Sequence, residues 1–87
     1  MKRVIDEIKE ILTQKLGLAD SEVTPQAHFM RDLGVDSLDY VELMMEFENA
    51  FNIKISEAES AMLKTVEQAA EFIESKLDSQ DIKNWAA

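Results

Sequence analysis

The sequence lacks cysteine altogether, and it holds one histidine, one proline and two glycines among its 87 residues. The absence of cysteine excludes a disulfide framework and thiolate metal sites, and we expect no metal site of any other kind. No apolar run approaches the ~20 residues that span a membrane, and residues 1–16 carry charges throughout, unlike a signal peptide. We therefore expect a soluble, cytoplasmic protein that does not insert into membranes.

Positive charge is also scarce, because nine basic residues face eighteen acidic ones and give a net charge of −9. Such a surface repels the phosphates of nucleic acids and anionic membranes. It favours docking to basic patches on other proteins, although a role in solubility alone stays open. Residues 32–53 contain no Lys or Arg at all. Within them, the spacing of three carboxylates predicts one acidic helix face: Asp39, Glu42 and Glu46.

Apolar residues at helical spacing predict two amphipathic helices in the first part of the chain. The first covers residues 2–16 and ends at Gly17, which suits a left-handed C-terminal cap. The second covers residues 38–51, and Asp36 is its expected N-cap. The stretch between Gly17 and Asp36 shows no long helical pattern. It predicts a long loop that is either functional or packed on the helices.

Two capping boxes predict the starts of two further helices. Ser56 and Glu59 form one capping box, and a short helix is expected to begin there. Thr65 and Gln68 form the other, and a longer helix is expected to begin there. The chain therefore reads as all-α, with four helices in one compact domain over residues 1–77, which we expect to be a monomer. For residues 78–87 two interpretations stay open, a short helix that begins at Ser79 or a frayed tail.

Ser37 stands at the predicted start of the second helix, but nothing in the sequence activates it as a nucleophile. The only histidine, His28, falls in the long loop, and the Gly-x-Ser-x-Gly elbow is absent. The surrounding acids would also destabilise an oxyanion, so we expect no catalysis. Because Asp36 can cap the helix, the Ser37 hydroxyl is left free. A helix N-terminus favours an attached phosphate there.

The run Phe29–Ile55 resembles the acyl carrier proteins, whose signature is an Asp-Ser-Leu triplet at the head of an acidic second helix. Here the triplet is Asp36-Ser37-Leu38, and the likeness covers nearly the whole domain, as far as Thr65-Val66. The resemblance implies a four-helix acyl-carrier-type bundle in which Ser37 carries 4′-phosphopantetheine, taken from coenzyme A by a separate transferase. The thiol of this arm would hold acyl groups as thioesters for enzymes of fatty-acid, lipid or polyketide synthesis.

Two sets of residues are expected to serve this function. The resemblance implies a recognition face toward basic patches on the phosphopantetheinyl transferase and the acyl-handling enzymes, formed by Asp36, Leu38, Asp39, Val41, Glu42, Met45 and Glu48. An acyl chain would lie between the second, third and fourth helices, because the short third helix is most easily displaced. The expected pocket residues are Leu43, Met44, Phe47, Met62, Leu63 and Ala69.

Some residues depart from the pattern of the family. Ser56 stands where fatty-acid carriers usually have proline, Asn49 where they often have a second acid, and Tyr40 adds an aromatic ring beside the recognition face. These departures favour a specialised carrier, for a polyketide or a modified lipid. Two alternatives stay open. One is a peptidyl or aminoacyl carrier, whose sequence around the serine is usually less acidic, and the other is an unmodified acidic helical adaptor.

Overall fold

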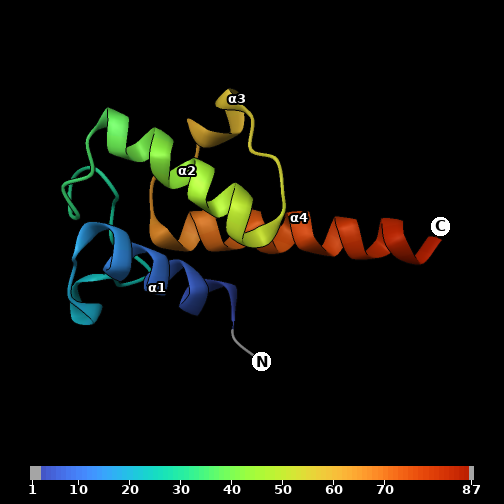
Figure 1. The fold of residues 1–87 in the computed structure, drawn as a ribbon, viewed down its shortest axis with the longest axis horizontal. Coiled ribbons are helices and arrows are strands. Elements are labelled where there is room, and N and C mark those ends of the chain that lie inside the picture. The colour runs from blue at the N-terminus through green and yellow to red at the C-terminus, as the bar shows by residue number, and fades with distance from the viewer. Residues whose placement is uncertain (1–2, 87) are drawn as a thin grey trace.

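The computed structural model describes the backbone of residues 3–86 and the side chains of residues 3–78. Its helices are α1 (Val4–Leu16), α2 (Ser37–Phe51), α3 (Glu57–Ser60) and α4 (Val66–Ala86), and a single 3-10 turn, η1 (Asp20–Glu22), lies in the long loop (Figure 1). No strand occurs in the described part of the chain, where the only β-type pairing is an isolated bridge between His28 and Thr65. The predicted all-α fold with a long loop and a short third helix is confirmed.

The helix ends follow from the capping residues that the sequence contains. Gly17 adopts a left-handed φ of 68°, and its N–H donates to the Thr13 carbonyl at 3.1 Å. In α3 the Ser56 Oγ accepts the Glu59 N–H at 3.1 Å, while a Glu59 carboxylate oxygen accepts the Ser56 N–H at 2.9 Å. The capping box before α4 is also present, since the Thr65 Oγ1 accepts the Gln68 N–H at 3.1 Å.

The last helix is the longest of the four, with 21 residues. α4 continues without interruption from Val66 to Ala86. The helix that we considered at Ser79 is therefore not a separate element, because the backbone is already helical before that residue. The side chains of residues 79–87 lie outside the described part.

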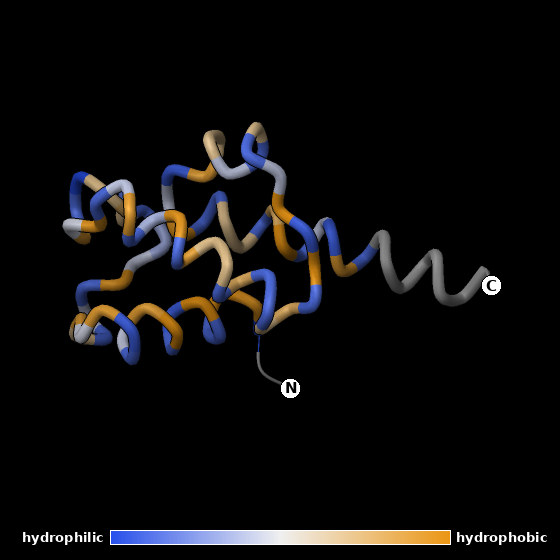
Figure 2. Tube along the Cα trace, turned by 45° about the horizontal axis from the view of Figure 1, so that its top comes forward, coloured by the Kyte–Doolittle hydropathy of each residue, from blue (hydrophilic) through white to orange (hydrophobic). Residues whose placement is uncertain are grey.

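The core forms where α1, α2 and α4 meet, and α1 packs against α4. α1 runs opposite to α2 and α4, and α3 lies on the side of α2 away from α1 (Figure 1). Apolar and polar residues alternate along the helices at helical spacing (Figure 2). The apolar side chains of α1, α2 and α4 that are fully or nearly fully buried are Ile8, Leu12, Leu43, Met44, Phe47, Val66, Ala69, Ala70 and Ile73.

The long loop between α1 and α2 is packed onto this core rather than free. Its buried side chains are Val23, Ala27, Phe29, Leu33 and Val35. Its backbone is tied to the start of α4, because the Ala27 carbonyl accepts the Val66 N–H at 3.1 Å and the Phe29 N–H donates to the Lys64 carbonyl at 2.9 Å. This packing explains how a small domain tolerates so long a connection, and it fixes the point at which α2 begins.

Candidate functional site

Ser37 is the first residue of α2, and its side chain is exposed. The turn before it is fixed by the buried side chains of Leu33 and Val35, with Gly34 between them at a left-handed φ of 70°. Asp36 caps the helix, since its Oδ1 accepts the Asp39 N–H at 2.8 Å. The structure records no hydrogen bond from the Ser37 hydroxyl to any described residue, so this hydroxyl is presented to solvent at a fixed position.

The recorded hydrogen bonds of His28 lie within the loop, and none of them reaches Ser37. The His28 Nδ1 accepts the Arg31 N–H at 3.1 Å, and the His28 backbone N–H donates to an Asp32 carboxylate oxygen at 2.8 Å. These contacts close a local turn within the loop. In the described side chains no group of three His, Cys, Asp or Glu residues is arranged to hold a metal ion.

The residues of the expected recognition face extend along the outer side of α2. Three large apolar side chains are exposed there, with Leu38 at 70% and both Val41 and Met45 at 56%. Glu42 is exposed among them, and Asp39 is half-buried. An apolar strip edged by carboxylates is the composition expected of a docking surface for a basic partner.

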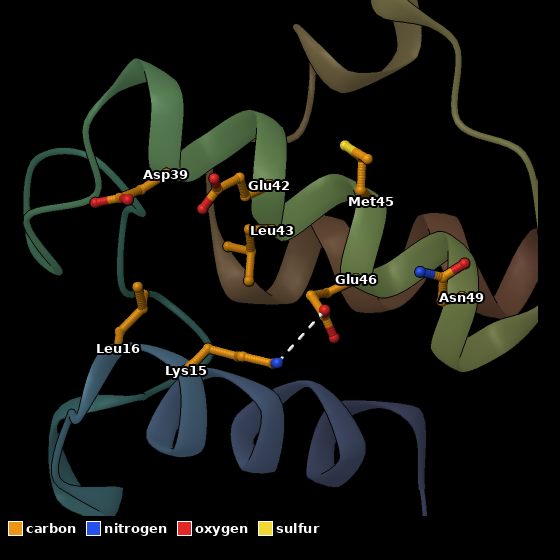
Figure 3. A pocket seen from close by; sticks show the side chains of 8 residues that line it. All are labelled: Lys15, Leu16, Asp39, Glu42, Leu43, Met45, Glu46 and Asn49. Atoms are coloured by element: carbon orange, nitrogen blue, oxygen red, sulfur yellow. Dashed lines mark ion pairs between the residues drawn. The ribbon is translucent and has the colours of Figure 1, made fainter.

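A groove of about 300 Å³ runs between α1 and the acidic side of α2 (Figure 3). It is lined by Lys15, Leu16, Asp39, Glu42, Leu43, Met45, Glu46 and Asn49. The Lys15 ammonium lies 3.5 Å from a Glu46 carboxylate oxygen across it, so part of the acidic face is neutralised by a cation from α1. The sequence of α2 does not predict this ion pair, because only the packing of α1 beside α2 brings the two residues together.

The chain is similar to known proteins over most of its length. A family model described as "Phosphopantetheine attachment site" matches residues 6–73. An acyl carrier protein of Karelsulcia muelleri (strain GWSS) is 44% identical over 80 residues, which cover 92% of this chain and 96% of that protein. The chain belongs to the acyl carrier protein family. Proteins of this family are carriers and not enzymes, and they bear phosphopantetheine.

The start of α2 in this acyl carrier protein fits such a group. A phosphodiester needs an accessible hydroxyl, and the exposed Ser37 has one; the N–H groups of the first turn together with the helix dipole would stabilise the charge of a phosphate held there. Family membership also implies a phosphopantetheinyl transferase and acyl-handling enzymes as partners. No helix in the described part of this acyl carrier protein is long and apolar enough to cross a membrane.

The residues expected to line the acyl pocket fall into two groups. Leu43, Met44, Phe47, Leu63 and Ala69 are all buried and contribute to one core cluster. Met62 is 73% exposed, because α3 ends at Ser60 and the turn that follows directs Met62 outward, so the structure separates it from the others. In this acyl carrier protein a smaller hollow of about 150 Å³ lies beside α3, lined by His28, Phe29, Met30, Tyr40, Ser60, Ala61, Leu63 and Lys64.

Glu48 has a structural contact that its place on the expected recognition face did not indicate. Its Oε2 accepts the Ile55 N–H at 2.8 Å, across the left-handed residue Asn52 that ends α2. This bond joins the last turn of α2 to the segment that leads into α3. A charge-assisted hydrogen bond of this kind stabilises the loop of the acyl carrier protein irrespective of any partner.

We expect Glu48→Ala to lower the free energy of unfolding by about 1.5 kcal/mol, because the Ile55 N–H loses a charged acceptor. The matched control is Glu42→Ala, which makes the same change on the same helix but removes an exposed side chain. It should change stability by no more than about 0.5 kcal/mol. Urea denaturation of both variants measures the difference, and equal losses would show that the Glu48 hydrogen bond does not support the fold.

Proposed function

We propose that Ser37 is the residue that bears phosphopantetheine, transferred from coenzyme A by a separate phosphopantetheinyl transferase. The observation that carries this assignment is the division of roles at the start of α2. Asp36 caps the helix through its carboxylate at 2.8 Å from the Asp39 nitrogen, which leaves the adjacent exposed hydroxyl of Ser37 without a structural role. In the transfer, the Ser37 hydroxyl gives up its proton to a base of the transferase and its oxygen forms a bond to phosphorus, while the pyrophosphate bond of coenzyme A breaks and the nucleotide part leaves with its terminal phosphate.

When bound, the group supplies a terminal thiol that holds acyl groups as thioesters. The chain contributes no thiol of its own, since it has no cysteine, so no side chain competes with the arm to form a thioester. We propose that the carrier acts as a monomer in the cytoplasm and delivers acyl groups to enzymes of fatty-acid, lipid or polyketide synthesis. The departures at Tyr40, Asn49 and Ser56 favour a specialised member within that range.

The partners bind, in this proposal, to the strip formed by Leu38, Val41 and Met45 with the carboxylates beside it. Apolar side chains at the centre supply affinity, and the acids on either side select partners with basic patches and accelerate encounter. The carboxylates assigned to this role are Asp36, Asp39, Glu42 and Glu48. Glu48 serves in part, because one of its oxygens is already bonded to the Ile55 N–H.

The direct test is treatment of the purified protein with coenzyme A and a promiscuous phosphopantetheinyl transferase. We expect the intact mass to increase by one phosphopantetheine group. An unchanged mass, in a reaction that modifies a control carrier, would contradict the carrier function and favour an unmodified acidic adaptor. If the mass increases as expected, mass spectrometry of the protein from its native host would identify the acyl group and distinguish acyl from aminoacyl or peptidyl cargo.

Glu42→Gln is expected to raise the KM of the transferase for this carrier by about two- to fivefold at low salt, because an exposed charge pair contributes about 0.5–1 kcal/mol. Its KM should also depend less on salt than that of the wild type. Glu71→Gln, which removes the same charge from an exposed position on α4, is the control and should leave the KM unchanged. Equal effects of the two substitutions would mean that net charge alone matters, and that Glu42 is not part of the docking strip.

A further inference from the structure

α3 is the least anchored helix of the domain. It spans only Glu57–Ser60, and none of its side chains is buried. Side-chain contacts hold the segment near its ends, where Glu59 pairs with Lys76 of α4 at 3.1 Å and Glu48 binds the Ile55 N–H. The pKa of Glu59 is lowered, first by its hydrogen bond with the Ser56 backbone and then by Lys76. A segment with so few buried apolar contacts opens more readily than the core helices.

Tyr40 provides the link between α2 and the C-terminal end of α3. Its hydroxyl is within hydrogen-bond reach of the carbonyl oxygens of Ser60 and Leu63. Its ring packs edge-on against the buried Phe29, with centroids 5.9 Å apart and an angle of 65° between the planes. Tyr40 is therefore fixed by the core on one side and holds α3 on the other. Displacement of α3 must break this hydrogen bond.

Tyr40 also borders the hollow of about 150 Å³ and lies one helical turn after Ser37. The buried side chains of Phe29 and Leu63 form part of the lining. An apolar space of this size accommodates a benzene-sized group. A longer alkyl chain would have to separate α3 from α2, since the interior behind Phe29 and Leu63 is already filled by buried residues of the core cluster.

We propose that Tyr40 is a positioning residue that holds α3 against α2 and thereby restricts the sequestered acyl group to short chains. The proposal rests on the function proposed above, because it concerns a group carried at Ser37. Short acyl groups occupy the hollow beside Tyr40 without movement of α3. Long acyl groups remain exposed unless the bond from the Tyr40 hydroxyl to the α3 end is broken.

The hold on α3 can be tested without any cargo. Tyr40→Phe removes the hydroxyl and keeps the ring, so the stacking on Phe29 is retained. In the unmodified protein, hydrogen exchange of the Ala61 and Met62 amides, which bond to carbonyls within α3, should become about fivefold faster, as expected for the loss of one hydrogen bond. Thr13→Ala, which removes a hydroxyl bond within α1, is the matched control and should leave these rates unchanged. Unchanged rates in Tyr40→Phe would overturn the proposal.

The restriction on cargo is tested by loading the phosphopantetheine-bearing protein with hexanoyl or dodecanoyl groups and measuring thioester cleavage by hydroxylamine. In the wild type, the hexanoyl thioester should be cleaved more slowly than the dodecanoyl thioester. In Tyr40→Phe, dodecanoyl cleavage should become about fivefold slower while hexanoyl cleavage stays the same. A variant that had only lost stability would show faster cleavage of both. If the rate of dodecanoyl cleavage relative to hexanoyl cleavage were the same in Tyr40→Phe as in the wild type, the proposal would be overturned.

The ring of Tyr40 gives a spectroscopic check, because it is the only tyrosine of the chain. Burial raises the pKa of Tyr40, and a hexanoyl group in the hollow should raise it further by excluding more water. Absorbance of tyrosinate during an alkaline titration measures this directly, and identical curves with and without hexanoyl would place the cargo elsewhere. If no phosphopantetheine is attached at all, the proposed function and the cargo restriction both fail, while the exchange rates still decide whether Tyr40 holds α3.

Discussion

Replacement of Ser37 by alanine is expected to abolish phosphopantetheine attachment completely, leaving the intact mass of the protein unchanged where the wild type is fully converted. The substitution removes the only atom to which the phosphorus could be bonded at this site. It should barely affect the fold, because Ser37 is exposed and Asp36 supplies the helix cap. Intact-mass spectrometry after reaction with coenzyme A and the transferase measures the loss.

Ser56 offers a matched control for this result, since it also lies at the start of a helix. Its hydroxyl is used differently, because it accepts the Glu59 N–H as the N-cap of α3. Ser56→Ala should therefore be modified to completion and yet lose about 1 kcal/mol of stability. Attachment to Ser37→Ala would show that another hydroxyl is used, and tandem mass spectrometry would identify it.

The two serines differ in their position relative to the helix cap, since Ser56 is itself the N-cap of α3 and Ser37 follows the Asp36 cap of α2. A serine that caps a helix has its oxygen turned toward the backbone, whereas a serine that follows the cap is free to react. In our proposal, the Asp36 carboxylate stabilises the helix start and the adjacent Ser37 hydroxyl is the group that is modified. The recorded hydrogen bonds of His28 lie within its own turn, and we expect the transferase to supply the base for attachment at Ser37.

Local sequence signals predicted the helix boundaries well, because each boundary depends on residues only three or four positions apart. The capping pairs at Ser56–Glu59 and Thr65–Gln68 both form as expected. The Asp36 cap forms as well, and Ser37 joins the helix one residue earlier than the predicted start. The end of the last helix was not predictable in this way, since no Gly or Pro after Leu77 signals a stop.

Contacts between distant residues could not be predicted from such signals. The pairing of Lys15 with Glu46 depends on how α1 packs near α2, and the bond from Glu48 to the Ile55 N–H depends on the left-handed turn at Asn52. Met62 was expected in the acyl pocket because the third helix was expected to form one of its walls. Its exposure is set by the point at which the short α3 ends, which the capping box at its start does not determine.

The loop between α1 and α2 contributes buried side chains to the core that helical periodicity does not predict. Phe29 is the central residue of this loop. The Phe29 ring is fully buried and packs against Tyr40. Its N–H donates to the Lys64 carbonyl at 2.9 Å, and its own carbonyl accepts the Val35 N–H at 3.0 Å. One residue thus joins the loop to the start of α4 and to the turn before Ser37.

We expect Phe29→Ala to lower the free energy of unfolding by about 3–5 kcal/mol, the usual cost of removing a buried phenylalanine ring. Small domains have a total stability of only about 5–15 kcal/mol, so the variant should be partly unfolded at moderate temperature. Urea denaturation measures the loss. Met30→Ala is the control, since the neighbouring side chain is 46% exposed and its removal should cost about 0.5 kcal/mol or less.

A milder substitution separates the packing of Phe29 from its contact with Tyr40. Phe29→Leu keeps an apolar side chain in the core but removes the edge-on ring contact, and its effect should not be additive with that of Tyr40→Leu, which removes the other ring of the pair. A double-mutant cycle would then give a coupling energy of about 0.5–1.5 kcal/mol. A loss below about 1 kcal/mol for Phe29→Ala itself would mean that the loop is not part of the folded core, and that the position of Ser37 depends on α2 alone.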